Sequence, residues 1–303
     1  MRISLFIAAI WLSVSSSFAC LNTVATTYEG ERVTTIDGSS WHRMQYALET
    51  RLAKEGAVNE RILRDAKSFK DRNDYAVALL HLGRNAEAVT LLTALEAEQP
   101  GNYYIAANLG TAHELTGNDT EALRWINEGI RRNPNGHHGT EWLHAKILET
   151  KLAAKQEPGF FEHHSVLDLQ PATARETILV GDQALSPAKV ATALGYQLEE
   201  RMKFVKPTDP VVAGLLYDYA VMEAVTSSME TAKNLLKMAG EYGFPTTKIA
   251  SLRRDLNRRF ITLFIEKYWP IGLPIVCVIG GIVFACKRGL GLYARSRRNL
   301  QKT

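Results

Sequence analysis

Histidines and acids form the one group in this sequence with the residue types of a metal site. Imidazoles together with Glu141 or Glu162 are ligands that Zn²⁺ accepts, so a metal-dependent hydrolase using His137, His138 and His144 is one hypothesis. The sequence has no H-E-x-x-H motif, and adjacent histidines in a turn usually point in different directions. We therefore favour hydrogen-bonding histidines and predict no metal and no cofactor. The histidines concerned are His137, His138, His144, His163 and His164.

Motifs of nucleophilic or phosphate chemistry do not occur in the chain. The sequence contains no G-x-S-x-G elbow, no phosphate-binding loop and no G-x-G-x-x-G. The charged runs Glu29-Gly30-Glu31 and Glu199-Glu200-Arg201 are typical of solvated surfaces. We therefore predict that the protein is not an enzyme.

Charge distribution argues against nucleic acid as a partner. The 303 residues carry a formal net charge of +4 and are 46% apolar. Six Lys and Arg residues, and no Asp or Glu, lie in residues 287–303, so the remainder has a net charge of about −2. A chain with that balance offers no basic surface for a phosphate backbone.

A short helical pattern occurs twice between Phe69 and Asn135, with an interval of 34 residues. Apolar residues recur every three or four positions within each copy, as amphipathic helices require. Small residues allow two paired helices to approach closely, and a glycine can close a helix in the left-handed conformation. The matching pairs are Gly83 and Gly117, Ala88 and Ala122, and Pro100 and Pro134.

This pattern resembles the tetratricopeptide repeat. The second copy fits better, through Leu109-Gly110, Glu121-Ala122 and Asn133-Pro134, whereas the first has Tyr75-Ala76 in place of Leu-Gly. The resemblance implies an all-α solenoid of helical hairpins whose first helices line a concave groove for a peptide or protein partner. The residues it assigns to partner binding are Asn73, Tyr104, Asn108, Thr111, Glu114, Glu141 and Trp142.

Further helices are predicted on both sides of the repeats, because two units cannot bury their stacking faces alone. Helices over 41–55 and 59–68 would form a pair that covers the N-terminal end of the array, after an irregular lead-in. A hairpin over 211–242 resembles a degenerate repeat. The predicted regions are a lead-in with capping helices at 20–68, the array at 69–155, an irregular linker at 156–186 with a short strand at 177–180, and a helical extension at 187–264.

The first 19 residues have the features of a secretory signal. Arg2 precedes an apolar run, and Ser17-Phe18-Ala19 places small residues where a signal peptidase cleaves. Cys20 would then be the first mature residue, and its lipidation is an alternative. An uncleaved membrane anchor is a second alternative.

Residues 268–286 contain no charged side chain and are long enough for one membrane-spanning helix. Tyr268 and Trp269 stand at its start, as aromatic residues do at membrane interfaces. The basic tail at 287–303 predicts a cytoplasmic C-terminus. We therefore predict a single-pass inner-membrane protein whose body is extracytoplasmic, in the periplasm or its equivalent.

The sequence thus predicts an all-α, tetratricopeptide-like scaffold or adaptor with a C-terminal helical extension and one transmembrane helix. An accessory subunit of an envelope enzyme or secretion assembly is the alternative, in which Gly280 and Gly281 would allow close helix contact.

Overall fold

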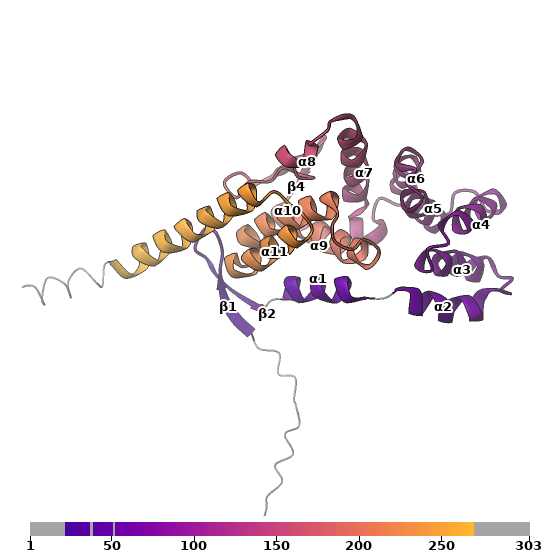
Figure 1. The fold of residues 1–303 in the computed structure, drawn as a ribbon, viewed down its shortest axis with the longest axis horizontal. Coiled ribbons are helices and arrows are strands. Elements are labelled where there is room, and N and C mark those ends of the chain that lie inside the picture. Colours follow the sequence, from indigo (N-terminus) through magenta and orange to yellow (C-terminus); the bar gives the residue numbers. More distant parts are fainter. Residues whose placement is uncertain (1–21, 37–38, 51, 270–303) are drawn as a thin grey trace, which may run out of the picture.

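The computed structural model describes residues 22–36, 39–50 and 52–269, and this part of the chain is mostly helical (Figure 1). A last helix covers residues 246–269. The other elements are β1 (Asn22–Thr26), β2 (Arg32–Ile36), α1 (Ser39–Glu49), α2 (Leu52–Leu63), α3 (Phe69–His81), α4 (Asn85–Glu98), α5 (Tyr103–Leu115), α6 (Asp119–Arg132), the 3-10 turn η1 (Gly136–Gly139), α7 (Glu141–Gln156), α8 (Phe160–His163), β3 (Ile178–Val180), β4 (Gln183–Leu185), α9 (Pro187–Phe204), α10 (Pro210–Thr226) and α11 (Met229–Glu241).

Two helical hairpins, α3–α4 and α5–α6, confirm the predicted repeats. The first and last residues of α5 and α6 lie 34 positions after those of α3 and α4. Gly83 and Gly117 connect the helices of each pair with φ angles of 73° and 83°, a conformation that a side chain disfavours. The repeated sequence therefore produces the same backbone twice.

Small residues bring the paired helices together as the sequence predicted. Ala88 and Ala122 are fully buried, and α5 passes so close to α6 that a Cβ atom on Gly110 would lie 2.4 Å from Cδ1 of Ile126. Gly129 is buried in α6, but its nearest neighbour, the backbone N of Ala107, would lie 3.7 Å from an added Cβ. The contact therefore requires glycine at position 110 only.

The helices that flank the repeats differ in part from the prediction. Helix α2 packs against α3 and α7 packs against α6, so both ends of the two-repeat array are covered. Helix α1, however, does not pair with α2: it lies against α9, with Met44 and Ala47 fully buried in a separate core (Figure 1).

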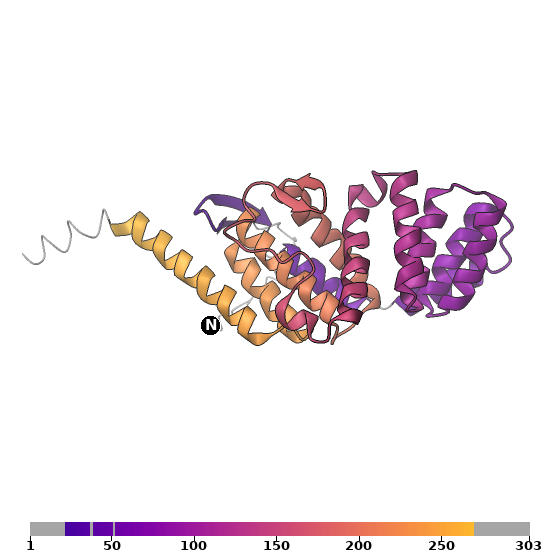
Figure 2. The same cartoon turned by 90° about the horizontal axis from the view of Figure 1, so that it is seen from above.

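The C-terminal region forms a helical bundle around α10. Residues Val211 to Ala224 of this helix are all buried, which is typical of a helix that is apolar on every side. Helices α9 and α11 pack on it, and α10 and α11 form the predicted hairpin. Figure 2 shows the array at one end of the molecule and, at the other, the C-terminal end of the helix over residues 246–269 projecting beyond the bundle.

The region between α7 and α9 packs against this bundle. The buried carboxylate of Asp218 in α10 accepts hydrogen bonds from the Ser165 hydroxyl at 2.7 Å and the Leu167 amide at 2.8 Å. The amides of Val166 and Leu169 also donate to it. The predicted strand at 177–180 is present as β3, which pairs with β4. The predicted irregular linker is thus anchored to the bundle by a carboxylate that only the folded chain brings near.

An N-terminal hairpin of β1 and β2 replaces the irregular lead-in that was predicted. Its turn is bound to the bundle, because the Tyr28 amide donates to the Ala224 carbonyl at 2.7 Å and the Tyr28 hydroxyl donates to Asp255 at 2.9 Å. The signal that sequence reasoning passed over is the β-branched residues on both sides of Glu29-Gly30. The fold is therefore mostly helical, with two small antiparallel hairpins in the described residues.

Within residues 22–36, 39–50 and 52–269, no helix combines the length and apolar character that crossing a membrane requires. The predicted signal at 1–19, the predicted span from residue 270 onward and the basic tail at 287–303 lie outside the described residues.

Substituting Gly110 by Ala is expected to lower the free energy of unfolding by about 1–3 kcal/mol, because the new methyl group overlaps the buried Ile126 side chain. Gly129→Ala is the control, since its methyl group has room and alanine favours a helix by up to about 1 kcal/mol. Urea denaturation followed by circular dichroism measures both. Equal destabilisation by the two substitutions would contradict the close contact.

Candidate partner-binding pocket

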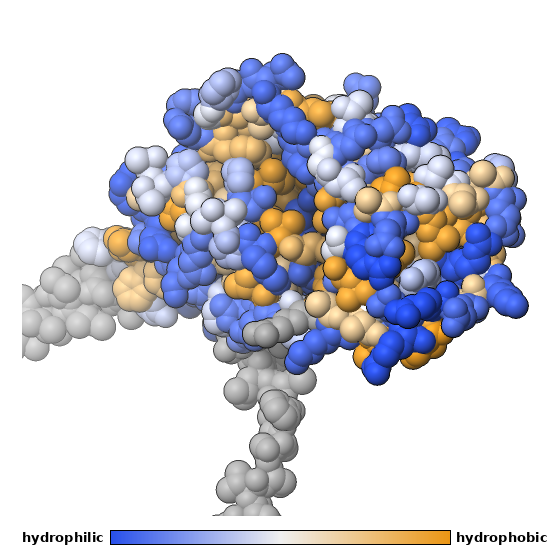
Figure 3. All heavy atoms as spheres, turned by 45° about the vertical axis from the view of Figure 1, so that its right-hand side comes forward, coloured by the Kyte–Doolittle hydropathy of each residue, from blue (hydrophilic) through white to orange (hydrophobic). Residues whose placement is uncertain are grey.

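A cavity of about 380 Å³ lies where the first helices of the repeats face α9. Helices α3, α5 and α7 supply one wall, as the repeat resemblance implied, and α9 with the segment after it supplies the other. Figure 3 shows hydrophilic and hydrophobic residues interspersed over the side that carries the array. The lining residues include Val77, Leu80, His81, Asn108, Thr111, Glu114, Leu115, Tyr196, Gln197, Glu200, Arg201 and Phe204.

Helix α9 occupies much of the concave side of the array. Gln197, Arg201 and Phe204 follow helical spacing and share one face of α9. Gln197 Nε2 lies 3.3 Å from Thr140 Oγ1, and the Phe204 ring centroid lies 5.8 Å from that of His81. The adjacent face of α9 carries Leu198 and Met202 into the bundle core. The groove is therefore reduced to a pocket by the protein's own chain.

Glu114 connects the array to α9 through a buried ion pair. Arg201 Nη1 and Nη2 lie 2.6 and 3.2 Å from its two carboxylate oxygens, and His144 Nε2 lies 2.8 Å from Oε2. Lys151 Nζ is 3.1 Å from Oε1. The Glu114 and Arg201 side chains are 7% and 11% exposed. Burial opposes the charged carboxylate, but Arg201 and His144 hold the pKa of Glu114 well below its ordinary value.

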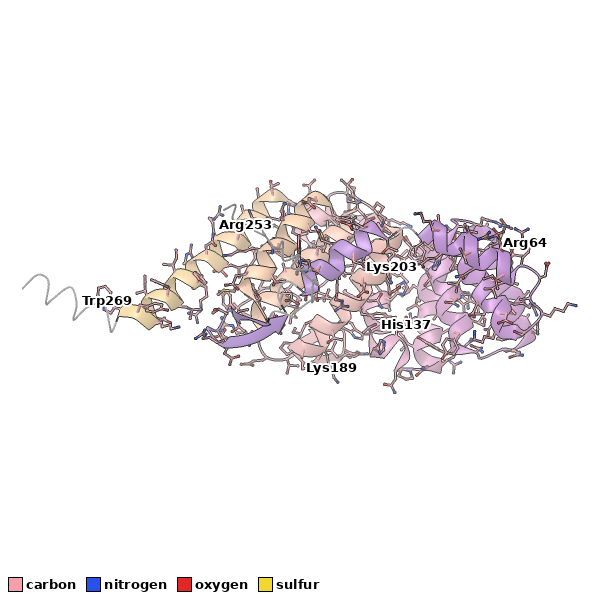
Figure 4. The ribbon with its side chains drawn as sticks, turned by 90° about the horizontal axis from the view of Figure 1, so that it is seen from below. Arg64, His137, Lys189, Lys203, Arg253 and Trp269 are labelled. Carbon is pink, nitrogen blue, oxygen red and sulfur yellow. The ribbon has the colours of Figure 1, made fainter. Side chains whose placement is uncertain are left out.

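A second buried acid, Glu141, organises the turn that precedes α7. Its Oε1 accepts from the Tyr103 hydroxyl at 3.2 Å and pairs with His137 Nδ1. The hydrogen bond to Glu141 raises the pKa of His137, and burial opposes that shift only in part. His137 and the neighbouring His138 both have left-handed backbones, with φ angles of 46° and 59°. Figure 4 places His137 where the array meets α9, which carries Lys203.

The histidines do not assemble the hypothesised metal site. Among the described residues, no group of three or more His, Cys, Asp or Glu side chains is arranged to hold an ion. His137 instead pairs with Glu141, His144 with Glu114, and His164 Nδ1 with Asp168 at 2.8 Å. His138 lies beside Tyr196, with ring centroids 5.5 Å apart. The metal-dependent hydrolase hypothesis therefore gains no support from this geometry.

The predicted binding residues fall into three groups. Asn108, Thr111 and Glu114 line the pocket. Glu141 and Trp142 line another cavity, of about 470 Å³, together with residues of β4 and α9. Asn73 and Tyr104 line neither cavity, and Tyr104 is 68% exposed on the outside of α5.

Several of the predicted residues already have partners within the chain. Asn108 Nδ2 donates to Asn73 Oδ1 at 2.8 Å, so this pair joins the two repeats. The Thr111 hydroxyl lies 3.3 Å from the Ala107 carbonyl of its own helix. The carboxylates of Glu114 and Glu141 are held in the ion pairs described above. Asn108 and Thr111 therefore remain in the pocket wall, but Asn108 also has a structural role.

Residues of α9 were missed because the sequence does not say where this helix docks. Tyr196, Gln197, Glu200, Arg201 and Phe204 all line the pocket. Gln197 and Arg201 are polar residues that fall on the apolar stripe of α9, at three- and four-residue spacing from Leu194, Leu198 and Met202, and this was the available signal. It indicates a buried polar partner without identifying Glu114, which lies 87 positions earlier.

Comparison with known proteins addresses the array. Residues 74–146 match the family described as Tetratricopeptide repeat, from α3 into α7. This part of the chain is a tetratricopeptide repeat region. Such repeats are generally scaffolds for protein–protein interaction, which agrees with the position of the pocket on the first helices of the units. No curated protein matches the chain.

Glu114→Gln is expected to lower the free energy of unfolding by about 3 kcal/mol, because it leaves Arg201 buried without its countercharge. The control is Glu199→Gln, also an ion-pair partner of an arginine, since the Arg43–Glu199 pair is 48% and 28% exposed and contributes at most about 1 kcal/mol. Urea denaturation of each variant makes the comparison. A loss below about 1 kcal/mol for Glu114→Gln would show that the pair does not stabilise the docked α9.

The His137–Glu141 pair is expected to make stability depend on pH. Because the folded-state pKa of His137 is raised, its contribution is complete below the unfolded value of 6.5 and is lost as pH rises through the raised value. The unchanged protein should therefore be more stable than His137→Asn at pH 6, and this difference in unfolding free energy should shrink by up to about 1 kcal/mol between pH 6 and pH 9. His138→Asn is the control in the same turn, and an equal pH dependence for both variants would exclude the pair as its cause.

Proposed function

We propose that this protein is a non-enzymatic scaffold that binds a protein partner in the pocket between the tetratricopeptide repeats and α9. The observation that carries the proposal is the pocket itself. The pocket lies on the side of the repeats with which such arrays bind their partners. Helix α9 packs beside the pocket without closing it.

The size and walls of the pocket favour a particular kind of contact. Its volume of about 380 Å³ lies near the lower end of the roughly 300–1,000 Å³ of small-ligand sites. Leu80, Leu115 and Phe204 provide apolar walls, whereas Asn108 and Glu200 provide polar groups. A site of this kind suits one or two apolar side chains of a partner, with hydrogen bonds to the adjacent backbone. It does not suit a long extended segment.

We further propose that the scaffold is exported and anchored in the inner membrane, with the body in the periplasm or its equivalent and the C-terminus in the cytoplasm. The uncharged residues 268–286 and the basic tail support this arrangement. Trp269 lies at the far end of the last helix from His137 at the array (Figure 4). A C-terminal anchor would thus leave the pocket accessible to a partner.

Thr111→Phe is expected to reduce capture of the partner at least about tenfold, because an aromatic ring would occupy the cavity that the partner must enter. Thr111 is preferable to Asn108, whose loss would also break the contact with Asn73. Capture is measured by chemical crosslinking in intact cells and identification of the attached protein, which also reports the compartment.

Thr90→Phe is the matched control for this experiment. Thr90 lies on α4, is exposed, and donates to the carbonyl four residues earlier at 3.0 Å, as Thr111 does in α5. Circular dichroism verifies that both variants fold. If folded Thr111→Phe captures as much partner as Thr90→Phe, the pocket is not the binding surface.

A further inference from the structure

The projecting end of the last helix carries the densest exposed apolar surface of the described residues. Six of their eleven exposed large apolar side chains fall within residues 260–269. Trp269 is 60% exposed and Phe264 is 56% exposed. The set consists of Phe260, Ile261, Phe264, Ile265, Tyr268 and Trp269. Figure 3 shows apolar surface on this end of the helix.

These side chains form a stripe along one side of the helix. Their spacing of one and four positions covers roughly half of the helical circumference. The other half carries Leu263, Glu266 and Lys267. Leu263 packs toward the N-terminal hairpin, because a Cβ atom on Gly30 would lie 2.6 Å from its Cδ2. Phe260 lies beside α11, with Lys233 Nζ 5.7 Å from the centroid of its ring, and the stripe beyond it faces away from the protein.

The sequence around the stripe indicates what covers it. From Tyr268 the chain continues without a charged residue to Cys286, and the basic tail follows. A tyrosine and a tryptophan at such a boundary are typical of the membrane–water interface. Arg253, Arg254 and Arg258, which are exposed earlier on the same helix, favour anionic lipid headgroups. The stripe itself is only about 15 Å long. One side of so short a helix has less surface than the roughly 800 Å² that each partner buries in a stable protein interface.

We infer that residues 260–269 form an interfacial helix whose apolar stripe lies in the headgroup region of an anionic lipid bilayer. The inference rests on the proposed membrane anchor. Glu266 and Lys267 on the opposite side keep that side in water, which distinguishes this segment from a membrane-spanning helix. Since the helix packs on the bundle through Leu252 and Leu256, the contact sets the orientation of the body relative to the membrane.

Photocrosslinking from the full-length chain tests the inference. A benzophenone amino acid is placed at Phe264 or, as the control, at Glu266 on the opposite side of the same helix. Each protein is reconstituted in vesicles of phosphatidylethanolamine and phosphatidylglycerol and irradiated, and adducts are identified by mass spectrometry. We expect about fivefold more lipid adduct at position 264 than at position 266.

Extraction of the same vesicles with alkaline carbonate separates the two proposals. Release of the chain would overturn the membrane anchor and, with it, this inference. Retention with equal lipid labelling at both positions, or with labelling of a second protein chain at position 264, would overturn the inference while the anchor stands. Retention with preferential lipid labelling at position 264 supports both.

Discussion

The buried pairing of Glu114 with Arg201 is the interaction on which the arrangement of the two halves depends. A carboxylate and a guanidinium removed from water are each costly unless they meet in good geometry with further hydrogen bonds. Here two guanidinium nitrogens, an imidazole and an ammonium group surround one carboxylate. Because Glu114 comes from α5 and Arg201 from α9, the buried guanidinium has this countercharge only while α9 is docked against the repeats.

Helix α7 connects the halves by a different means. Leu143 and Ile147 are part of the bundle core, whereas Ala145 and Leu148 pack with Ala122 and Ile126 of α6. A helix that is apolar on two faces belongs to two cores at once. The repeats thus end on the bundle instead of on solvent, and the stacking face of the second unit needs no separate cap.

This construction determines the shape of the cavity on the array. In an open array the first helices would present a continuous groove, but α9 lies over part of it, and a pocket beside Phe204 remains. The last helix leaves the bundle on the side away from the array (Figure 2). A proposed partner surface and a proposed membrane surface at opposite ends of a packed body would hold a bound protein at a defined height above the bilayer.

The sequence by itself determined the repeat hairpins, because their signals are local: the spacing of Gly83 and Gly117, small residues at Ala88 and Ala122, and helical periodicity within each element. It also predicted the hairpin of α10 and α11 and the placement of Asn108 and Thr111 on the concave side. Only the tertiary structure decided that α1 joins the bundle, that Asp218 holds the region before α9, and that Arg201 enters the groove. Those outcomes depend on buried charges and apolar faces that meet partners far away in the chain. Helical periodicity indicates that a face of a helix is buried, but it does not identify the element that packs against that face.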